Sequence, residues 1–219
     1  MRNKSSSKIE KIMFLAEHLP CFTLSDLAVV ETNRHYLKVL FSRYGKAGKL
    51  IRLKRGFYVA KEYLDITEKK GQLSFYLEFI ARLLYLPAYL SLDYVLYEHN
   101  ILTEIPRNFT LVTKNKTTRL VNQFGNFFYH KIKDELFGGF EIIKKNNLAV
   151  FKATKAKALF DFFYLRKNIL NNEKAVAELR LNLDNFSPKD WQEFKKYFTL
   201  ENSKKMKEIF GYLLKTWKK

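Results

Sequence analysis

Apolar residues recur at helical spacing three times near the start of the chain. A capping sequence, Ser7 to Glu10, opens the first run, and Pro20 ends it. Thr23 can cap a second, short helix with an inward-facing apolar side made of Leu24, Leu27 and Ala28. Thr32 can cap a third helix, whose apolar stripe at i, i+3, i+4 and i+7 consists of Leu37, Leu40, Phe41 and Tyr44. The pattern therefore predicts three consecutive helices.

Two short segments of strand-like composition follow, at residues 50–53 and 57–60. They are joined by Lys54, Arg55 and Gly56, and Gly56 can adopt the positive φ of a tight turn. Three helices followed by a basic hairpin is the order of elements in a winged helix-turn-helix. We therefore predict a winged helix-turn-helix domain over residues 1–64.

The remaining chain has the pattern of a second, larger domain over residues 72–219, after a polar linker at residues 65–71. Helices are predicted near residues 73–85 and 92–100. Four segments have strand-like composition and favour an antiparallel sheet: residues 109–113, 126–132, 140–145 and 148–152. More helices are predicted near residues 154–165, 173–183, 187–197 and 203–217. The fold class is therefore α+β, with an N-terminal winged helix-turn-helix, an antiparallel sheet and C-terminal helices.

Basic residues are concentrated in the predicted winged helix-turn-helix. The formal net charge of +18 indicates a polyanionic partner, because clustered Lys and Arg side chains gain affinity by releasing the counterions of phosphates. From Thr32 to Lys61 there are nine basic residues and no acidic residue. A solvated helical face usually mixes charges of both signs. The distribution favours a DNA interface, with a solvated basic face as the alternative.

The third predicted helix should present its non-core face to the major groove of DNA. On that face, His35 and Ser42 can hydrogen-bond base edges, and Val39 can contact a thymine methyl group. The cations of the hairpin suit phosphates or the minor groove. The basic residues predicted to bind DNA are Arg34, Lys38, Arg43, Lys46, Arg52, Lys54 and Arg55.

A second basic cluster lies farther along the chain, largely in a predicted loop. It consists of Lys114, Lys116, Arg119 and Lys131. The cluster can form a second surface for a polyanion or a partner protein. Because loops are usually polar, a solvated loop is an equally good interpretation.

Patterns typical of enzymes and metal sites are missing from the sequence. The histidines lack paired ligand spacing, and the single cysteine, Cys21, excludes an internal disulfide and a multi-cysteine zinc site. No glycine motif or D-x-D motif suits nucleotide or phosphoryl chemistry. Five acidic residues could in principle meet as a nuclease site, although their spacing does not suggest it: Asp93, Glu98, Asp134, Glu135 and Asp161. We therefore expect no enzymatic activity, no cofactor and no metal.

The apolar segments also bear on localisation. Residues 12–19 are too short an apolar stretch for a secretory signal, and residues 73–102 carry charges that would be costly in a bilayer. A single cysteine suits a reducing compartment. We expect a cytoplasmic protein without a membrane partner.

Several short segments carry sequence motifs that are more specific than the overall composition of the chain. The first domain contains FTLSDLA at residues 22–28 and LIRLKRGFYV at residues 50–59. More distinctive segments lie at residues 89–92, 110–119, 124–127, 137–140 and 153–161. Together these segments, which are spread along most of the chain, resemble the AbiEi family, the antitoxins and transcriptional repressors of AbiE-type abortive-infection, type IV toxin-antitoxin systems.

The resemblance implies a role for each domain. The first would bind inverted repeats in the double-stranded DNA of its own promoter. The second would neutralise a cognate nucleotidyltransferase-like toxin, directly or indirectly, and would aid cooperative DNA binding. The alternative is a winged-helix regulator or a protein-interaction module without antitoxin activity. The operator sequence and the oligomeric state stay open.

Overall fold

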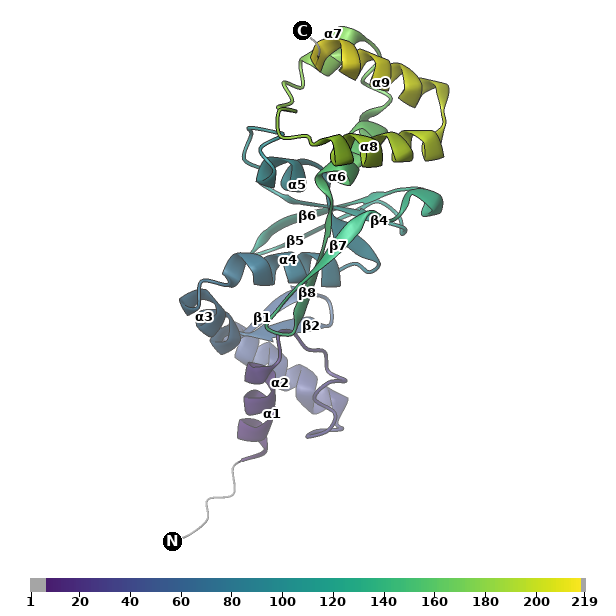
Figure 1. The fold of residues 1–219 in the computed structure, drawn as a ribbon. Helices are drawn as coiled ribbons and strands as arrows, with labels where there is room; N and C mark the ends of the chain where they lie inside the picture. Colours follow the sequence, from purple (N-terminus) through teal and green to yellow (C-terminus); the bar gives the residue numbers. More distant parts are fainter. Residues whose placement is uncertain (1–6, 218–219) are drawn as a thin grey trace. The chain divides into compact units, whose positions relative to one another are not determined.

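The computed structural model describes residues 7–217, which belong to two compact units (Figure 1). The N-terminal unit extends to Leu77, and the C-terminal unit begins at Glu78, within helix α4 (Leu73–Leu83). The chain is α+β, with helices at the start, a sheet and helices at the end. Among the described residues, no helix combines the length and the apolar character needed to cross a bilayer.

The N-terminal unit begins with α1 (Lys8–His18), followed by α2 (Arg34–Lys46) and a hairpin of β1 (Leu50–Lys54) and β2 (Phe57–Ala60). The predicted capping box of α1 is confirmed, because the backbone N–H of Glu10 donates to the Ser7 hydroxyl and the Glu10 carboxylate accepts from the Ser7 N–H. Helix α2 starts one residue later than predicted. Its cap is Asn33, whose side-chain oxygen accepts the N–H of Tyr36 at 3.0 Å.

The helix predicted to start after Thr23 is wrong, because residues 24–30 form turns. The Asp26 carboxylate accepts both the N–H and the hydroxyl of Thr23, at 2.6 and 2.9 Å. The same type of contact opens α1, but here the backbone does not continue as an α-helix. The backbone N–H groups of Ala28 and Val30 accordingly bond to carbonyls three residues back. Leu27 is buried as predicted, whereas Ala28 is exposed.

The predicted linker at residues 65–71 is also wrong for most of its length. Helix α3 (Lys61–Lys69) covers this segment as far as Lys69. Its buried residues Leu64 and Thr67 lie three positions apart, and Lys61 pairs with Asp65 at 2.6 Å one helical turn away. A polar composition therefore concealed an amphipathic helix.

One aromatic cluster forms the centre of the N-terminal unit. Phe22 pairs with Tyr58 of β2 through two backbone hydrogen bonds, of 2.8 and 2.9 Å. The ring of Phe41, from α2, lies 5.6 Å from the ring of Phe22 and 4.8 Å from that of Tyr58. The predicted stripe of α2 is confirmed as buried at Leu37, Leu40 and Phe41. Helix α2 and the hairpin therefore share one core.

The C-terminal unit contains a six-stranded sheet in the order β5-β6-β4-β3-β8-β7. Its strands are β3 (Ala88–Leu90), β4 (Phe109–Thr113), β5 (Thr118–Asn122), β6 (Gly125–Lys131), β7 (Phe140–Lys145) and β8 (Leu148–Ala153). All four predicted strands are present, but the predicted antiparallel arrangement is wrong. The sheet is mixed, because β3 runs parallel to β8 and β4 runs parallel to β6.

Helices surround this sheet and complete the unit. They are α4, α5 (Leu92–Glu98), the short 3-10 turn η1 (Asp134–Leu136), α6 (Lys155–Arg166), α7 (Glu173–Ala177), α8 (Pro188–Glu201) and α9 (Lys204–Trp217). The helices predicted from residues 154 and 187 are capped by Thr154 and Ser187, since each side-chain oxygen accepts a backbone N–H three residues on. Helix α7 ends at Ala177, earlier than predicted. Helix α6 packs against α5 and α8, and α7 packs against α9.

Candidate nucleic-acid interface

The outer face of α2 carries every residue that the sequence predicted there. Its members are all exposed: Arg34, His35, Lys38, Val39, Ser42, Arg43 and Lys46. Val39 is 56% exposed, although it is apolar and lies in the middle of the helix. The predicted exposure of this face is therefore confirmed. We call it the α2 face.

Two contacts fix cations of the α2 face. The Arg34 guanidinium donates to the Ser25 hydroxyl at 3.2 Å, which ties the first turn of α2 to the preceding turn segment. The Arg43 guanidinium lies 5.3 Å from the ring centre of Tyr44. The hydrogen bond between Ser25 and Arg34 was not predicted, because the two residues lie nine positions apart and only the folded turn brings them together.

The β1–β2 hairpin presents its cations unequally. Arg52 and Arg55 are exposed, whereas Lys54 is half-buried and its ammonium group lies 4.2 Å from the centre of the Phe57 ring. Partial burial lowers the pKa of Lys54. Gly56 has a φ of +83°, a backbone conformation that L-residues rarely adopt. Arg52 and Arg55 are therefore the better placed of the three predicted contacts.

Backbone hydrogen bonds hold the hairpin and the end of α2 together. The N–H of Lys49 donates to the carbonyl of Tyr44 at 2.9 Å, and the N–H of Lys61 donates to the carbonyl of Lys49 at 2.9 Å. The Phe41 and Tyr58 rings add contact on the buried side. The α2 face and the hairpin cations consequently have fixed relative positions.

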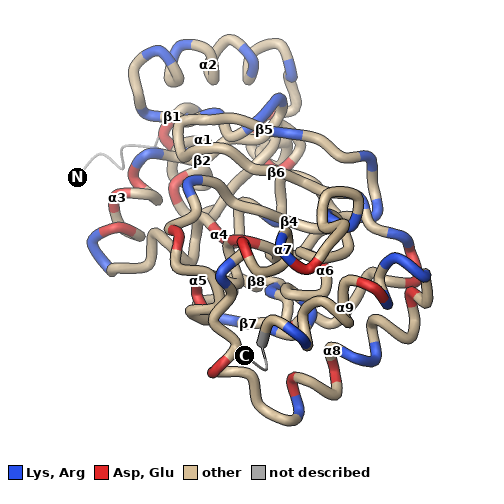
Figure 2. The backbone as a smooth tube through the Cα atoms, turned by 90° about the horizontal axis from the view of Figure 1, so that it is seen from above, with Lys and Arg blue, Asp and Glu red and all other residues tan. Residues whose placement is uncertain are grey.

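Glu31, the acidic residue that precedes α2 in the sequence, is buried and paired. Glu31 is only 6% exposed; it pairs with Lys8 and accepts the N–H of Asn33 at 2.7 Å. The bond from Lys8 and the bond from the Asn33 N–H lower the pKa of Glu31, so its carboxylate is ionised but matched by a cation. Figure 2 shows α2 with basic residues and no acidic ones. The outer face of α2 is therefore uniformly basic.

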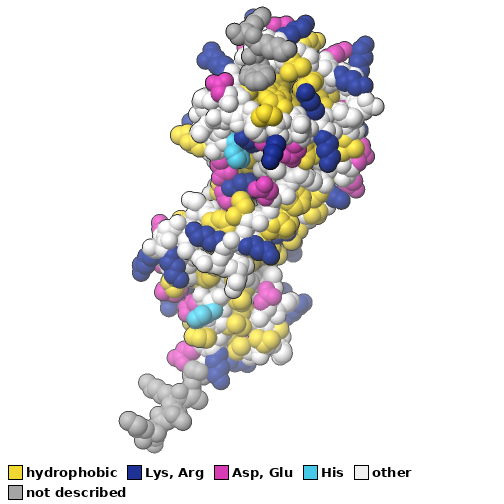
Figure 3. All heavy atoms as spheres, in the orientation of Figure 1, with side chains coloured by type: hydrophobic (Ala, Val, Ile, Leu, Met, Phe, Trp, Pro, Cys, Tyr) yellow, Lys and Arg dark blue, Asp and Glu magenta, His cyan; other side chains and the backbone are white. Residues whose placement is uncertain are grey.

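The second basic cluster is only partly a loop. Lys114 and Lys116 are exposed between β4 and β5, whereas Arg119 lies on β5 and Lys131 ends β6. The loop lies beside the end of β6, since the Lys131 N–H donates to the Thr117 hydroxyl at 3.0 Å. On the side of the C-terminal unit seen in Figure 3, basic and acidic side chains are intermixed. The four cations are spread over a loop and two strands, whereas one helix carries the α2 face.

The five acidic residues considered as a nuclease site are not brought together. Asp93, Glu98 and Asp161 each pair with a different cation. Asp134 and Glu135 are exposed on η1. Within residues 7–217, no three His, Cys, Asp or Glu side chains lie close enough together to hold a metal ion.

No protein-family model matches the sequence, and no curated protein matches it. The candidate interface therefore rests on the charge and geometry of the N-terminal unit.

Proposed function

We propose that the N-terminal unit binds double-stranded DNA as a winged helix-turn-helix. In this proposal α2 enters the major groove, which is wide enough for an α-helix, and the hairpin contacts phosphates or the minor groove. The observation that carries the proposal is the α2 face, which is exposed over its whole length, basic and without an acidic residue. Counterion release from DNA favours such a surface.

The residues of the interface take different roles in this proposal. His35 and Ser42 contact base edges, and Val39 contacts a thymine methyl group. Arg52 and Arg55 contact the backbone, and Lys54 supports the hairpin by packing on Phe57. In this proposal the turn segment at residues 24–30 takes the role of the helix that precedes a recognition helix in a helix-turn-helix.

We further propose, on the family resemblance, that the chain is a cytoplasmic repressor of its own operon and an antitoxin. It would bind inverted repeats in its promoter and oppose a nucleotidyltransferase-like toxin, without enzymatic activity of its own. The competing proposal is a regulator or interaction module without antitoxin activity. The mixed charge of the C-terminal unit is compatible with either role, so the neighbouring gene distinguishes the two.

The test of DNA binding compares contacts to phosphates with contacts to bases. Arg55→Ala should weaken binding to promoter and random duplexes alike, and should reduce the slope of log K against log salt by about 0.9. His35→Ala and Ser42→Ala should instead change sequence preference in a selection from random duplexes. Fluorescence anisotropy over a salt series measures the first effect.

Lys69→Ala provides the matched control, because Lys69 is an exposed cation of the same unit at the end of α3. It should leave affinity, salt slope and sequence preference unchanged. Promoter binding that is indifferent to Arg55, His35 and Ser42 would contradict the winged-helix proposal.

The antitoxin role is tested by expressing the adjacent gene with and without this chain. The expected result is growth arrest by the neighbour alone and growth when both are expressed. A chain carrying Arg55→Ala should still protect, because toxin neutralisation is assigned to the C-terminal unit. Continued arrest in the presence of the chain would refute the antitoxin role and leave the DNA-binding proposal intact.

A further inference from the structure

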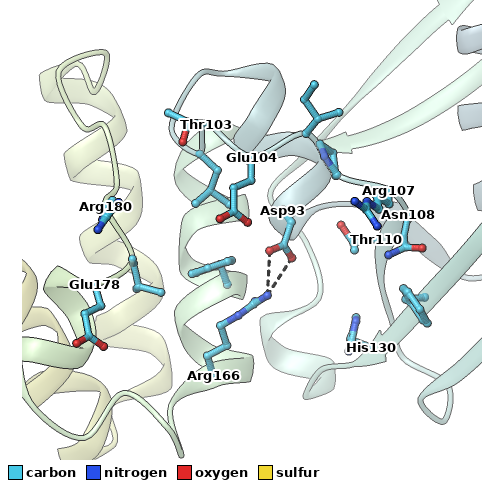
Figure 4. Close-up of a pocket in the computed structure, with 16 residues that line it drawn as sticks. Asp93, Thr103, Glu104, Arg107, Asn108, Thr110, His130, Arg166, Glu178 and Arg180 are labelled. Atoms are coloured by element: carbon cyan, nitrogen blue, oxygen red, sulfur yellow. Dashed lines mark hydrogen bonds and ion pairs between the residues drawn. The ribbon is translucent and has the colours of Figure 1, made fainter.

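A cavity of ≈ 1300 Å³ opens inside the C-terminal unit, away from every residue assigned a role so far. The loop at residues 102–108 forms one wall, and the segment after α7 at residues 178–180 forms another. Strand β6 contributes Phe128 and His130, and helix α6 contributes Phe162 and Arg166. Figure 4 shows Arg180 and Arg107 on opposite sides of the cavity, with Asp93 and Arg166 between them.

The cations around this cavity are all arginines: Arg107, Arg166 and Arg180. The C-terminal unit has only five arginines against twenty lysines, yet none of its lysines is among the lining residues. Arginine differs from lysine in its planar fork of donors, which matches the oxygens of a carboxylate or a phosphate. The use of arginine here points to recognition of such a group.

Ion pairs engage only some of the charged side chains that line the cavity. One terminal nitrogen of Arg166 donates to both carboxylate oxygens of Asp93 at 3.0 Å, and Glu178 pairs with Lys174 at 4.0 Å. Arg107 and Arg180 make no ion pair with any described residue, and the same holds for Glu104. The lining therefore holds three arginines and three carboxylates, and Arg107 and Arg180 are the cations whose guanidinium groups are available to an anionic ligand.

Arg166 and His130 add hydrogen-bond donors to the lining of the cavity. The Arg166 guanidinium lies 3.7 Å from the centre of the Phe162 ring, and Asp93 occupies only one of its three nitrogens. Burial lowers the pKa of His130, and the nearby positive charge of Arg166 lowers it further. The imidazole is therefore neutral at neutral pH and offers one donor and one acceptor.

Apolar side chains supply another part of the lining, chiefly Leu102, Ile105, Phe128, Phe162 and Leu179. Ile105 is 74% exposed, an unusual position for a large aliphatic residue on a loop. We propose that the cavity binds an organic anion, a carboxylate or phosphate ester on an apolar body, with its charged group between Arg107, Arg166 and Arg180. Pockets with an apolar lining and a few convergent polar groups are typical ligand sites.

The test is isothermal titration of the full chain with two matched pairs of probes at millimolar concentration. Adenosine monophosphate is compared with adenosine, and benzoate with benzyl alcohol, so that each pair differs mainly in the anionic group. At least one anion should bind, with its neutral counterpart at least about tenfold weaker. The pair that responds distinguishes a phosphate ligand from a carboxylate ligand.

The double variant Arg107→Gln/Arg180→Gln locates the binding. Neither arginine has a salt bridge with a described residue, so the thermal unfolding midpoint should not change while anion affinity falls at least about tenfold. The control Lys189→Gln/Lys207→Gln removes the same charge from exposed positions on α8 and α9 and should bind normally. The proposal is overturned if no anion binds, if the neutral probes bind equally well, or if the two double variants behave alike.

Discussion

Replacing Asp161 with asparagine is expected to destabilise the C-terminal unit by about 3–5 kcal/mol, because the change leaves a buried lysine without its counter-charge. Asp161 and Lys157 are both fully buried and pair across one turn of α6. Removal of the carboxylate charge forces Lys157 either to remain as an unpaired cation or to lose its proton. Both alternatives are costly in the interior.

The surroundings of this pair explain why the expected loss of stability is so large. The hydroxyls of Tyr89 and Ser91 donate to the Asp161 carboxylate at 3.0 and 2.8 Å, and the Lys157 ammonium lies 5.1 Å from the Tyr197 ring centre. Burial raises the pKa of Asp161 and lowers that of Lys157, and their mutual attraction opposes both shifts. No water-exposed position is available to either charge in the native state.

Urea denaturation, monitored by tryptophan fluorescence, measures the stability of the C-terminal unit. Both tryptophans, Trp191 and Trp217, belong to that unit. The matched control is Lys157→Met/Asp161→Asn, which removes both charges but keeps an oxygen to accept from Tyr89 and Ser91. This double variant should regain most of the lost stability. If it is no more stable than Asp161→Asn alone, the unpaired charge is not the cause.

Replacing Phe41 with alanine is expected to destabilise the N-terminal unit by about 3–5 kcal/mol, the range found for truncating a buried aromatic residue. Phe41 is 4% exposed and contacts both Phe22 and Tyr58. The cavity left by its ring would lie between α2 and the hairpin. Since these elements carry the proposed DNA contacts, DNA affinity should fall with stability.

Hydrogen exchange of peptides from α2 and the hairpin measures this effect within the N-terminal unit, which contains no tryptophan. Val39→Ala is the matched control, because Val39 belongs to the same helix but is 56% exposed. It should change stability by less than about 0.5 kcal/mol. Equal exchange rates in the two variants would contradict the assigned core.

Local signals explain what could be predicted from the sequence. The apolar stripe of α2, the glycine turn of the hairpin and the capping box of α1 each involve residues only a few positions apart. Their hydrogen bonds and burial follow from periodicity and capping, so the sequence alone determined these elements. The exposure of the α2 face follows from the same periodicity, since the stripe opposite is apolar.

Features that bring together residues far apart in the sequence were decided by the tertiary structure. The three-residue strand β3 is too short to have a pattern of its own, yet it lies inside the sheet, next to β8, and makes the sheet mixed. The segment after Thr23 forms turns in place of the predicted helix, and the N–H groups of Ala28 and Val30 bond to carbonyls three residues back. Neither outcome is visible from spacing alone.

The same division applies to the two candidate sites. The sequence by itself determined the basic, acid-free face of α2, because one helix carries all of it. Only the tertiary structure gathered Arg107, Arg166 and Arg180 around one cavity and buried Asp161 against Lys157 among residues from β3 and α8. The physical reason is that these arrangements depend on which strands pair and which helices pack, and that choice depends on the burial achieved by the whole chain.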